Sequence, residues 1–369
     1  MMTIEKVLEA LSNVQEPDLG KDLVTLNMVK DVAINGNEVS FTVVLTTPAC
    51  PMKDMIKNAC INAIKLLLNK EAVVQVNFTA NTTSKRVDNK SILPNVKNII
   101  AVVSGKGGVG KSTVAANLAI ALSQGGAKVG LMDADIYGPS VPIMFGVRGA
   151  RPLMKEENGK AMIVPLEKHG IKLMSIGLLV DEKNAVVWRG PMASSAIRQF
   201  VTDVIWDELD YLVVDMPPGT GDIHLTLMQL VPVTGVIVVT TPQDVALADA
   251  KKGIAMFGQA QLNVPLIGLI ENMSYFIPPG GGTELPDNKY YIFGKDGGKR
   301  LADEYDIPFL GQIPLIQSIR EGGDDGVPVM AGDDAVSKKA FEEFASYAVR
   351  SIAMMNANLK SAKVAEVIA

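Results

Sequence analysis

The segment 104–113, Ser-Gly-Lys-Gly-Gly-Val-Gly-Lys-Ser-Thr, is the feature that most restricts what this chain can fold into. It follows an apolar run at 98–104 and precedes a helical pattern at 113–124. A strand, a glycine-rich loop ending in Lys-Ser, and a helix in that order match the phosphate-loop pattern G-x-x-x-x-G-K-[ST]. Glycines let successive backbone N–H groups surround phosphate oxygens, and the helix N-terminus adds a favourable potential. We therefore predict a site for a nucleoside triphosphate.

The residues of this loop have distinct expected roles. We expect Lys111 to reach the β- and γ-phosphates and the Ser112 hydroxyl to ligate Mg²⁺. A dinucleotide-binding G-x-G-x-x-G loop with Asp133 on the ribose is a less specific alternative, because it does not require Lys-Ser after the last glycine. A glycine-rich turn without a ligand is the other alternative. Nucleotide binding is assigned to Gly105, Lys106, Gly107, Gly108, Val109, Gly110, Lys111, Ser112 and Thr113.

The chain after residue 95 predicts an α/β fold with a mainly parallel, doubly wound sheet. Short apolar runs alternate with helical stretches, and near-continuous apolar strands indicate a sheet covered on both faces. These runs lie at 98–104, 128–132, 171–176, 211–215, 235–240, 265–270 and 308–312.

The part before residue 81 predicts a small, separate α/β domain. The pattern there indicates a helix, a hairpin around Asn35-Gly36-Asn37, a second helix and a last strand. Their expected ranges are 4–11, 31–34, 38–45, 52–68 and 72–78. The polar stretch 81–95 has linker composition. We therefore predict a domain at 1–80, a linker at 81–95 and a nucleotide-binding domain at 96–369.

Three aspartates follow strands of the predicted sheet, where the carboxyl ends of parallel strands form a ligand crevice. Asp133 and Asp135 follow the second strand of this domain, and Asp215 ends a later one. We assign Asp215 to Mg²⁺, Asp133 to a Mg²⁺-bound water, and Asp135 to positioning the attacking water. A loop or helix cap is the alternative for Asp-Ala-Asp at 133–135. Lys111 and Asp135 are thus catalytic candidates.

Two further segments extend the candidate site. The loop Pro217–Gly221 resembles a switch, in which a backbone N–H near Gly219 contacts the γ-phosphate; a structural turn is the alternative. His224 beyond it is either part of the switch or, as we favour, a solvated histidine at a helix start. Asn272 ends another strand and suits the adenine edge, with Pro314 packing nearby. A strand-end cap is the alternative for Asn272.

Composition excludes several classes of protein. The chain has only two cysteines and two histidines, which excludes a disulfide framework. Its net charge of −5 does not suit a nucleic-acid binder. No apolar run reaches the ~20 residues of a membrane-spanning helix, and the N-terminus does not resemble a signal peptide. We expect a cytoplasmic protein without nucleic-acid or membrane partners.

Together these motifs resemble the Mrp/ApbC group of deviant Walker A ATPases, also called iron–sulfur cluster carrier proteins. The resemblance rests on residues 104–113 with the second lysine Lys106, on 133–140, 188–192 and 215–222, and on Glu-Asn-Met-Ser-Tyr-Phe at 271–276. The segment 45–51, with Thr-Thr-Pro-Ala-Cys-Pro, resembles a small domain of iron–sulfur assembly factors.

The resemblance implies ATP hydrolysis, a nucleotide-sandwich homodimer, and transient [4Fe–4S] binding for delivery to apo iron–sulfur client proteins. It also implies that Lys106 reaches the phosphates bound by the other subunit, which makes Lys106 a third catalytic candidate; a solvated loop lysine is the alternative. In the family, a Cys-x-x-Cys follows the position of Phe276, but Pro278 and Gly281 stand there in this chain. Neither residue can ligate iron.

Three interpretations of this departure stay open. The protein carries no cluster, it uses Cys50 as a cluster ligand, or it is an assembly regulator that kept only the ATP switch. Cys60 has helical spacing with core residues and is expected to be buried. The alternative function is a positioning or scaffold ATPase of the partition and division-site kind without a metal role. Such a protein needs a membrane-targeting helix or a basic DNA-binding surface. The tail 359–368 is only weakly amphipathic, and the acidic balance of the chain disfavours DNA.

Overall fold

The computed structural model describes residues 2–84, 92–157, 159–180, 188–259, 262–278 and 289–358. The described chain forms two compact units. The first contains residues up to Thr83 together with Ala353–Asn358, and the second contains Ser84–Ile352. Within the described ranges, no helix is long and apolar enough to cross a bilayer. The tail 359–368 and Gly281 lie outside the described residues.

The first unit is a three-stranded sheet covered by two helices. Strand β4 (Glu38–Leu45) pairs with β3 (Val29–Asn35) antiparallel and with β5 (Val73–Ala80) parallel. Alternate β4 side chains, among them Phe41 and Val43, are buried against helices α1 (Ile4–Leu11) and α2 (Lys53–Leu67). The short strands β1 (Gln15–Glu16) and β2 (Lys21–Asp22) form a separate pair. The predicted hairpin and both helices are confirmed.

The second unit is built on an eight-stranded sheet of order β10-β11-β7-β12-β6-β13-β14-β15 in the described chain. All neighbours are parallel except β10, which pairs antiparallel with β11. The mainly parallel sheet predicted from the apolar runs is therefore confirmed. The strands are β6 (Val96–Val103), β7 (Val129–Asp133), β10 (Leu166–Lys168), β11 (Ile171–Ser175), β12 (Leu209–Asp215), β13 (Gly235–Thr240), β14 (Leu266–Glu271) and β15 (Phe309–Gln312).

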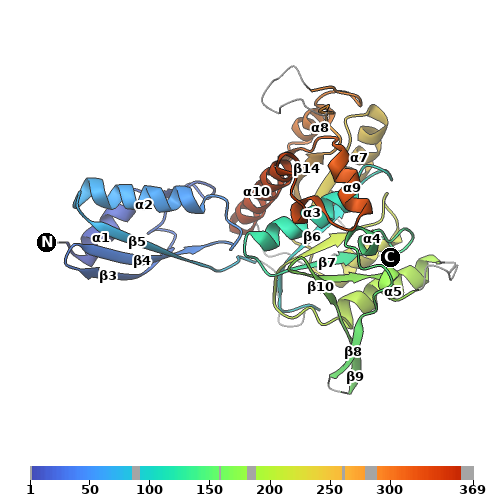
Figure 1. Cartoon of the computed structure of the whole chain (residues 1–369), viewed down its shortest axis with the longest axis horizontal. Helices are drawn as coiled ribbons and strands as arrows, with labels where there is room; N and C mark the ends of the chain where they lie inside the picture. Colours follow the sequence, from blue (N-terminus) through green and yellow to red (C-terminus); the bar gives the residue numbers. More distant parts are fainter. Residues whose placement is uncertain are drawn as a thin grey trace. The chain divides into compact units, whose positions relative to one another are not determined.

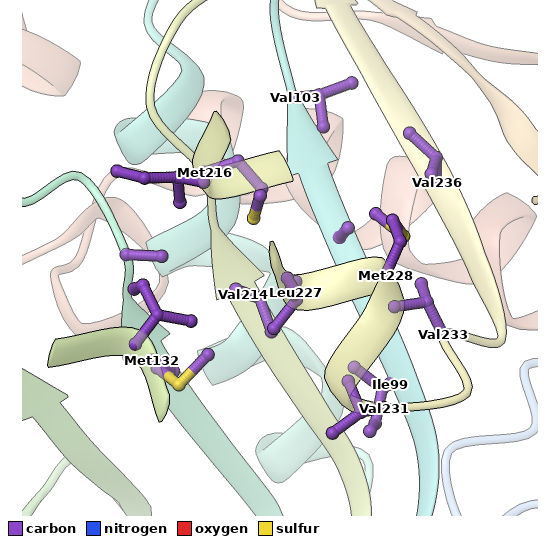
Figure 2. Packing of buried hydrophobic residues seen from close by; sticks show 14 of the residues in the cluster. Ile99, Val103, Met132, Val214, Met216, Leu227, Met228, Val231, Val233 and Val236 are labelled. Atoms are coloured by element: carbon purple, nitrogen blue, oxygen red, sulfur yellow. The ribbon is translucent and has the colours of Figure 1, made fainter. Parts of the chain in front are cut away.

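Helices cover both faces of this sheet. One face packs against helices α5 to α8, and Figure 2 shows Leu227 and Met228 of α6 over Ile99 and Val214 of the central strands. Helix α3 contacts β6, β7 and β12; we place it on the opposite face, because successive strand residues point to alternate faces. The helices are α3 (Lys111–Gln124), α4 (Val141–Met144), α5 (Gly190–Thr202), α6 (Asp222–Leu230), α7 (Asp244–Phe257), α8 (Gly297–Glu304), α9 (Gln317–Asp324) and α10 (Ala335–Asn358).

A β-hairpin extends from this unit beyond the main sheet (Figure 1). It consists of β8 (Leu153–Glu157) and β9 (Lys160–Val164), paired antiparallel. Its base is fixed where the Ile163 N–H donates to the Asp203 carbonyl at 2.7 Å.

Candidate nucleotide-binding site

The strand order brings the phosphate loop and the aspartates together. Strand β12 lies between β6 and β7, and its register aligns Asp215 with both Val102 of β6 and Asp133 of β7. The carboxyl ends of these three strands therefore lie at one edge of the sheet, although the chain separates them widely. This is the crevice expected for an open parallel sheet.

At several positions of the phosphate loop, only glycine fits the backbone conformation or the space available. Gly108 and Gly110 both have φ of +81°, in the left-handed region. A Cβ on Gly105 would lie 2.2 Å from the Asp249 carbonyl carbon of α7, and a Cβ on Gly110 would lie 2.2 Å from Nδ2 of Asn272. Gly108 and Lys106 are exposed, so this side of the loop is open to a ligand.

Lys111 forms the centre of the site. It is buried at 6% exposure, and its ammonium nitrogen lies 2.5 Å from Oδ1 of Asp215 and 3.7 Å from Oδ2 of Asp135. The same nitrogen lies 3.3 Å from the Ser112 hydroxyl. One ammonium group therefore contacts the residue expected to bind Mg²⁺ and the residue expected to position water.

Asp133 is the third carboxylate of this cluster. Its Oδ1 accepts the Asp135 N–H at 3.1 Å, and its Oδ2 accepts the Ser175 hydroxyl at 2.9 Å. Burial and then the nearby Asp215 charge raise the pKa of Asp133, and burial also raises the pKa of Asp135. Three carboxyl groups around a single ammonium group suit a bound cation, which would favour their ionised forms.

The donors present fit Mg²⁺. Oδ2 of Asp215 is buried and makes no hydrogen bond in the described structure, and the Ser112 hydroxyl lies beside Lys111. A hydroxyl and one or two carboxylates, completed by waters and phosphate oxygens, are a typical Mg²⁺ environment. Among the described residues, no three His, Cys, Asp or Glu side chains form a metal-binding group by themselves.

The predicted switch loop is attached to the phosphate loop through Ser104, which the sequence analysis did not single out. The Gly219 N–H donates to the Ser104 carbonyl at 2.8 Å, and the Ser104 hydroxyl donates to the Lys106 carbonyl at 3.0 Å. The only sequence signal for Ser104 is its position directly before the loop. The contact of Gly219 with a γ-phosphate stays a prediction, and its N–H is bonded elsewhere in this structure.

The Asn272 side chain contacts the backbone of the phosphate loop. Its Nδ2 donates to the Val109 carbonyl at 2.8 Å, which leaves its second N–H and its oxygen for a ligand. Pro314 is buried after β15. Preceding Asn272, the fully buried Glu271 accepts from Ser274, from the Gly298 N–H and from Gln312. Base recognition by Asn272 and Pro314 stays a prediction.

His224 corrects the sequence analysis. It lies in the first turn of a helix as expected, but it is 0% exposed instead of solvated. Burial lowers its pKa to about 4, partly offset by the Gly221 and Pro217 carbonyls. The error arose because the polar residues around it, including Asp222, suggested a solvated turn. In the structure, the side of this turn that carries His224 faces Phe257 of α7. The centroids of the two rings are 6.3 Å apart.

The two cysteines belong to the first unit. Cys60 in α2 is 0% exposed, and burial raises its pKa to about 12, which confirms the expected core position. Cys50 is partly exposed in the loop before α2, and neither cysteine forms a disulfide. The role of Cys50 as a cluster ligand stays a prediction.

The parallel sheet, the glycine-rich phosphate loop and the Lys111–Asp215 pair define a P-loop NTPase. The chain belongs to the family described as NUBPL iron-transfer P-loop NTPase, whose model matches residues 95–349. A second family model, described as iron–sulfur cluster assembly protein, matches residues 4–78.

Individual relatives agree with this assignment. The chain is 50% identical to a protein of Synechocystis sp. named iron-sulfur cluster carrier protein, over 96% of this chain and 99% of that protein. It is 46% identical to the Escherichia coli protein of the same name, over 88% and 85%. A solved nucleotide-binding protein from Archaeoglobus fulgidus, in complex with ADP, is 38% identical with a TM-score of 0.55 and covers 65% of this chain and 92% of that one.

Proposed function

We propose that this protein is a Mg²⁺-dependent ATP hydrolase of iron–sulfur cluster assembly that carries clusters and transfers them to apo-proteins in the cytoplasm. The observation that carries the proposal is the Lys111–Asp215 pair under a complete phosphate loop, in a chain that also contains an iron–sulfur assembly region. Relatives that match nearly the whole chain carry the name of cluster carriers.

The side chains of the site suit ATP hydrolysis. Backbone N–H groups of the phosphate loop bind the phosphates, and Lys111 exchanges Asp215 for β- and γ-phosphate oxygens. Ser112 and Asp215 would hold Mg²⁺, with Asp133 on one of its waters, and the cation would neutralise charge that develops on the phosphates. Asp135, whose pKa burial raises, orients the attacking water and accepts its proton.

Lys106 supports a homodimer. Its side chain is exposed, while its carbonyl is fixed by the Ser104 hydroxyl at 3.0 Å. A lysine with a fixed backbone and an exposed ammonium group is suited to reach phosphates bound by a second subunit. The nucleotide would then lie between two chains, each of which completes the other's site.

The iron–sulfur cluster is the cargo. We assign Cys50 as the ligand that this chain offers, because it is partly exposed before the N-terminus of α2, where a thiolate is favoured. Two chains provide two such thiolates, and a [4Fe–4S] cluster takes four. A small thiol or the client protein supplies the remaining ligands. In this proposal, residues 1–80 form the domain that binds the cluster, residues 81–95 form the linker, and residues 96–369 form the ATPase domain.

The comparisons do not favour a positioning or scaffold ATPase, because the near-full-length relatives are named as cluster carriers. Such a protein would sediment with liposomes or DNA in the presence of ATP. We expect no ATP-dependent sedimentation with either.

Anaerobic reconstitution with iron and sulfide tests the carrier function. Wild type should bind iron and sulfide, show a visible cluster absorption band, and transfer the cluster to an apo-acceptor. Cys50→Ala should lose all three properties, whereas the matched Cys60→Ala, at a buried site, should keep them. Absence of iron from the wild-type protein, or full retention by Cys50→Ala, would overturn the assignment of Cys50. ATP turnover is measured separately on each protein and tests the hydrolase independently.

A further inference from the structure

A buried histidine whose ring nitrogens make no hydrogen bond of ordinary geometry in the described structure follows the switch loop. His224 is 0% exposed, and its backbone N–H donates to the Gly221 carbonyl at 3.1 Å. Neither ring nitrogen makes a hydrogen bond within the described part of the chain. Buried polar side chains are normally paired, so two unpaired nitrogens on one ring call for a physical reason.

The loop in front of His224 is held by few contacts on its outer side. Pro218, Thr220 and Gly221 are exposed, whereas the Gly219 N–H is bonded to the Ser104 carbonyl at 2.8 Å. Breaking that one bond frees the N–H that the proposed mechanism directs to the γ-phosphate. The loop carbonyls of Pro217 and Gly221 already lie close enough to His224 to influence its pKa.

Two clefts lined by residues of the loop leave room for it to move. A cleft of about 580 Å³ is lined by Asp135, Tyr137 and Pro218 among others. A second of about 520 Å³ is lined by Thr220 of the loop, by Leu225 of α6 and by Met256 of α7. Residues of the loop therefore line both clefts, and the His224 ring is buried.

We propose that His224 is a positioning residue of the switch: its imidazole hydrogen-bonds the backbone of residues 217–221 in the conformation in which the Gly219 N–H has left Ser104 for the γ-phosphate. A neutral imidazole has one donor and one acceptor, and burial keeps the ring neutral. The donor reaches a loop carbonyl, of which Pro217 and Gly221 are nearest. In the structure described here, neither nitrogen makes a hydrogen bond of ordinary geometry, although the Pro217 and Gly221 carbonyls lie close by. A modest shift of the loop would complete the bond, so His224 favours the rearranged loop. The proposal rests on the proposed ATP hydrolysis.

A pair of substitutions separates this role from simple core packing. His224→Phe keeps a planar ring but removes both polar atoms, and His224→Gln keeps a donor and an acceptor. A core residue would tolerate Phe, because it removes unsatisfied atoms, and Gln would be the more harmful change. The proposal predicts the opposite order for turnover.

The measurements are kcat for ATP, the Kd for ADP, thermal unfolding, and amide hydrogen exchange of residues 217–224 with and without a non-hydrolysable ATP analogue. His224→Phe should lower kcat about tenfold, the effect of one buried hydrogen bond, and lose the protection that the analogue induces. Its Kd for ADP should stay within about twofold and its unfolding temperature should not fall. His224→Gln should recover most of kcat and the protection.

Equal kcat and equal protection in wild type and His224→Phe would overturn the proposal, and so would a parallel loss of kcat, ADP binding and stability. If Phe does not fit, His224→Met also lacks the two nitrogens and carries the same comparison with Gln. Should wild type hydrolyse no ATP, the proposed function fails. The amide exchange with the analogue still decides whether His224 positions the loop.

Discussion

The ammonium group of Lys111 donates a 2.5 Å hydrogen bond to Oδ1 of Asp215, and both side chains are buried. This pair joins the start of α3 to the end of β12. Each charge stabilises the other in a region where an unpaired charge would be unfavourable. The pair therefore stabilises this part of the fold and holds the lysine where a phosphate can take over from the carboxylate.

Replacing Lys111 tests both roles of this pair. Lys111→Ala should weaken ATP binding about a hundredfold, because charge-assisted hydrogen bonds to phosphate are lost. It should also lower the free energy of unfolding without nucleotide by about 3 kcal/mol, because Asp215 loses its partner. Isothermal titration and urea unfolding measure the two effects. Lys128→Ala, which removes a 67% exposed lysine, is the control and should change neither. Unchanged ATP affinity in Lys111→Ala would contradict the assignment.

Replacing Asp135 separates chemistry from binding. Asp135→Asn should lower kcat by about a hundredfold or more, the usual effect of losing a general base. ADP affinity should stay nearly constant, since Asp215 remains the nearest partner of Lys111. Asp222→Asn, a similar change in the same cleft, should have little effect on kcat. Normal hydrolysis by Asp135→Asn would show that the assignment to water positioning is wrong.

The buried carboxylate of Glu271 should matter for stability. It accepts from three groups on β15, α8 and the chain after β14, so Glu271→Ala leaves the buried Gly298 N–H without an acceptor and removes one acceptor each from Ser274 and Gln312. We expect the free energy of unfolding to fall by about 2–3 kcal/mol. Glu271→Gln should be milder. Glu208→Ala, at a side chain 78% exposed, should stay within about 0.5 kcal/mol of wild type. Equal stability of the two alanine variants would refute this role.

Acid should destabilise the protein through His224. Its pKa is about 4 in the folded chain against an ordinary value of 6.5, so the unfolded chain binds the proton more tightly. The stabilisation is complete above pH 6.5 and is lost as the pH falls toward 4. The full effect corresponds to roughly 3 kcal/mol. Urea unfolding at pH 7 and pH 5 measures about 2 kcal/mol of this effect.

In His224→Gln the difference between these two measurements should shrink, since the titrating ring is gone. His169 is present in both proteins, so the comparison isolates His224. An equal acid-induced shift in the two proteins would contradict the prediction.

The sequence determined the class of fold and the chemistry of the nucleotide loop, because both depend on local patterns. Buried parallel strands form continuous apolar runs, and Gly108 and Gly110 need glycine where the backbone is left-handed. The strand-end positions of Asp133, Asp135 and Asp215 follow from the same runs. The absence of Cys-x-x-Cys at 278–281 is also a property of the sequence alone.

Only the tertiary structure decided which of these residues contact one another. The pairing of β12 with both β6 and β7 brings Asp215 to Lys111, and tertiary packing buries His224 of α6 near Phe257 of α7. Ser104 joins the switch loop to Lys106 through one carbonyl and one hydroxyl, and no pattern along the chain predicts that geometry. Such contacts depend on strand order and on packing between distant segments, which local propensity does not specify.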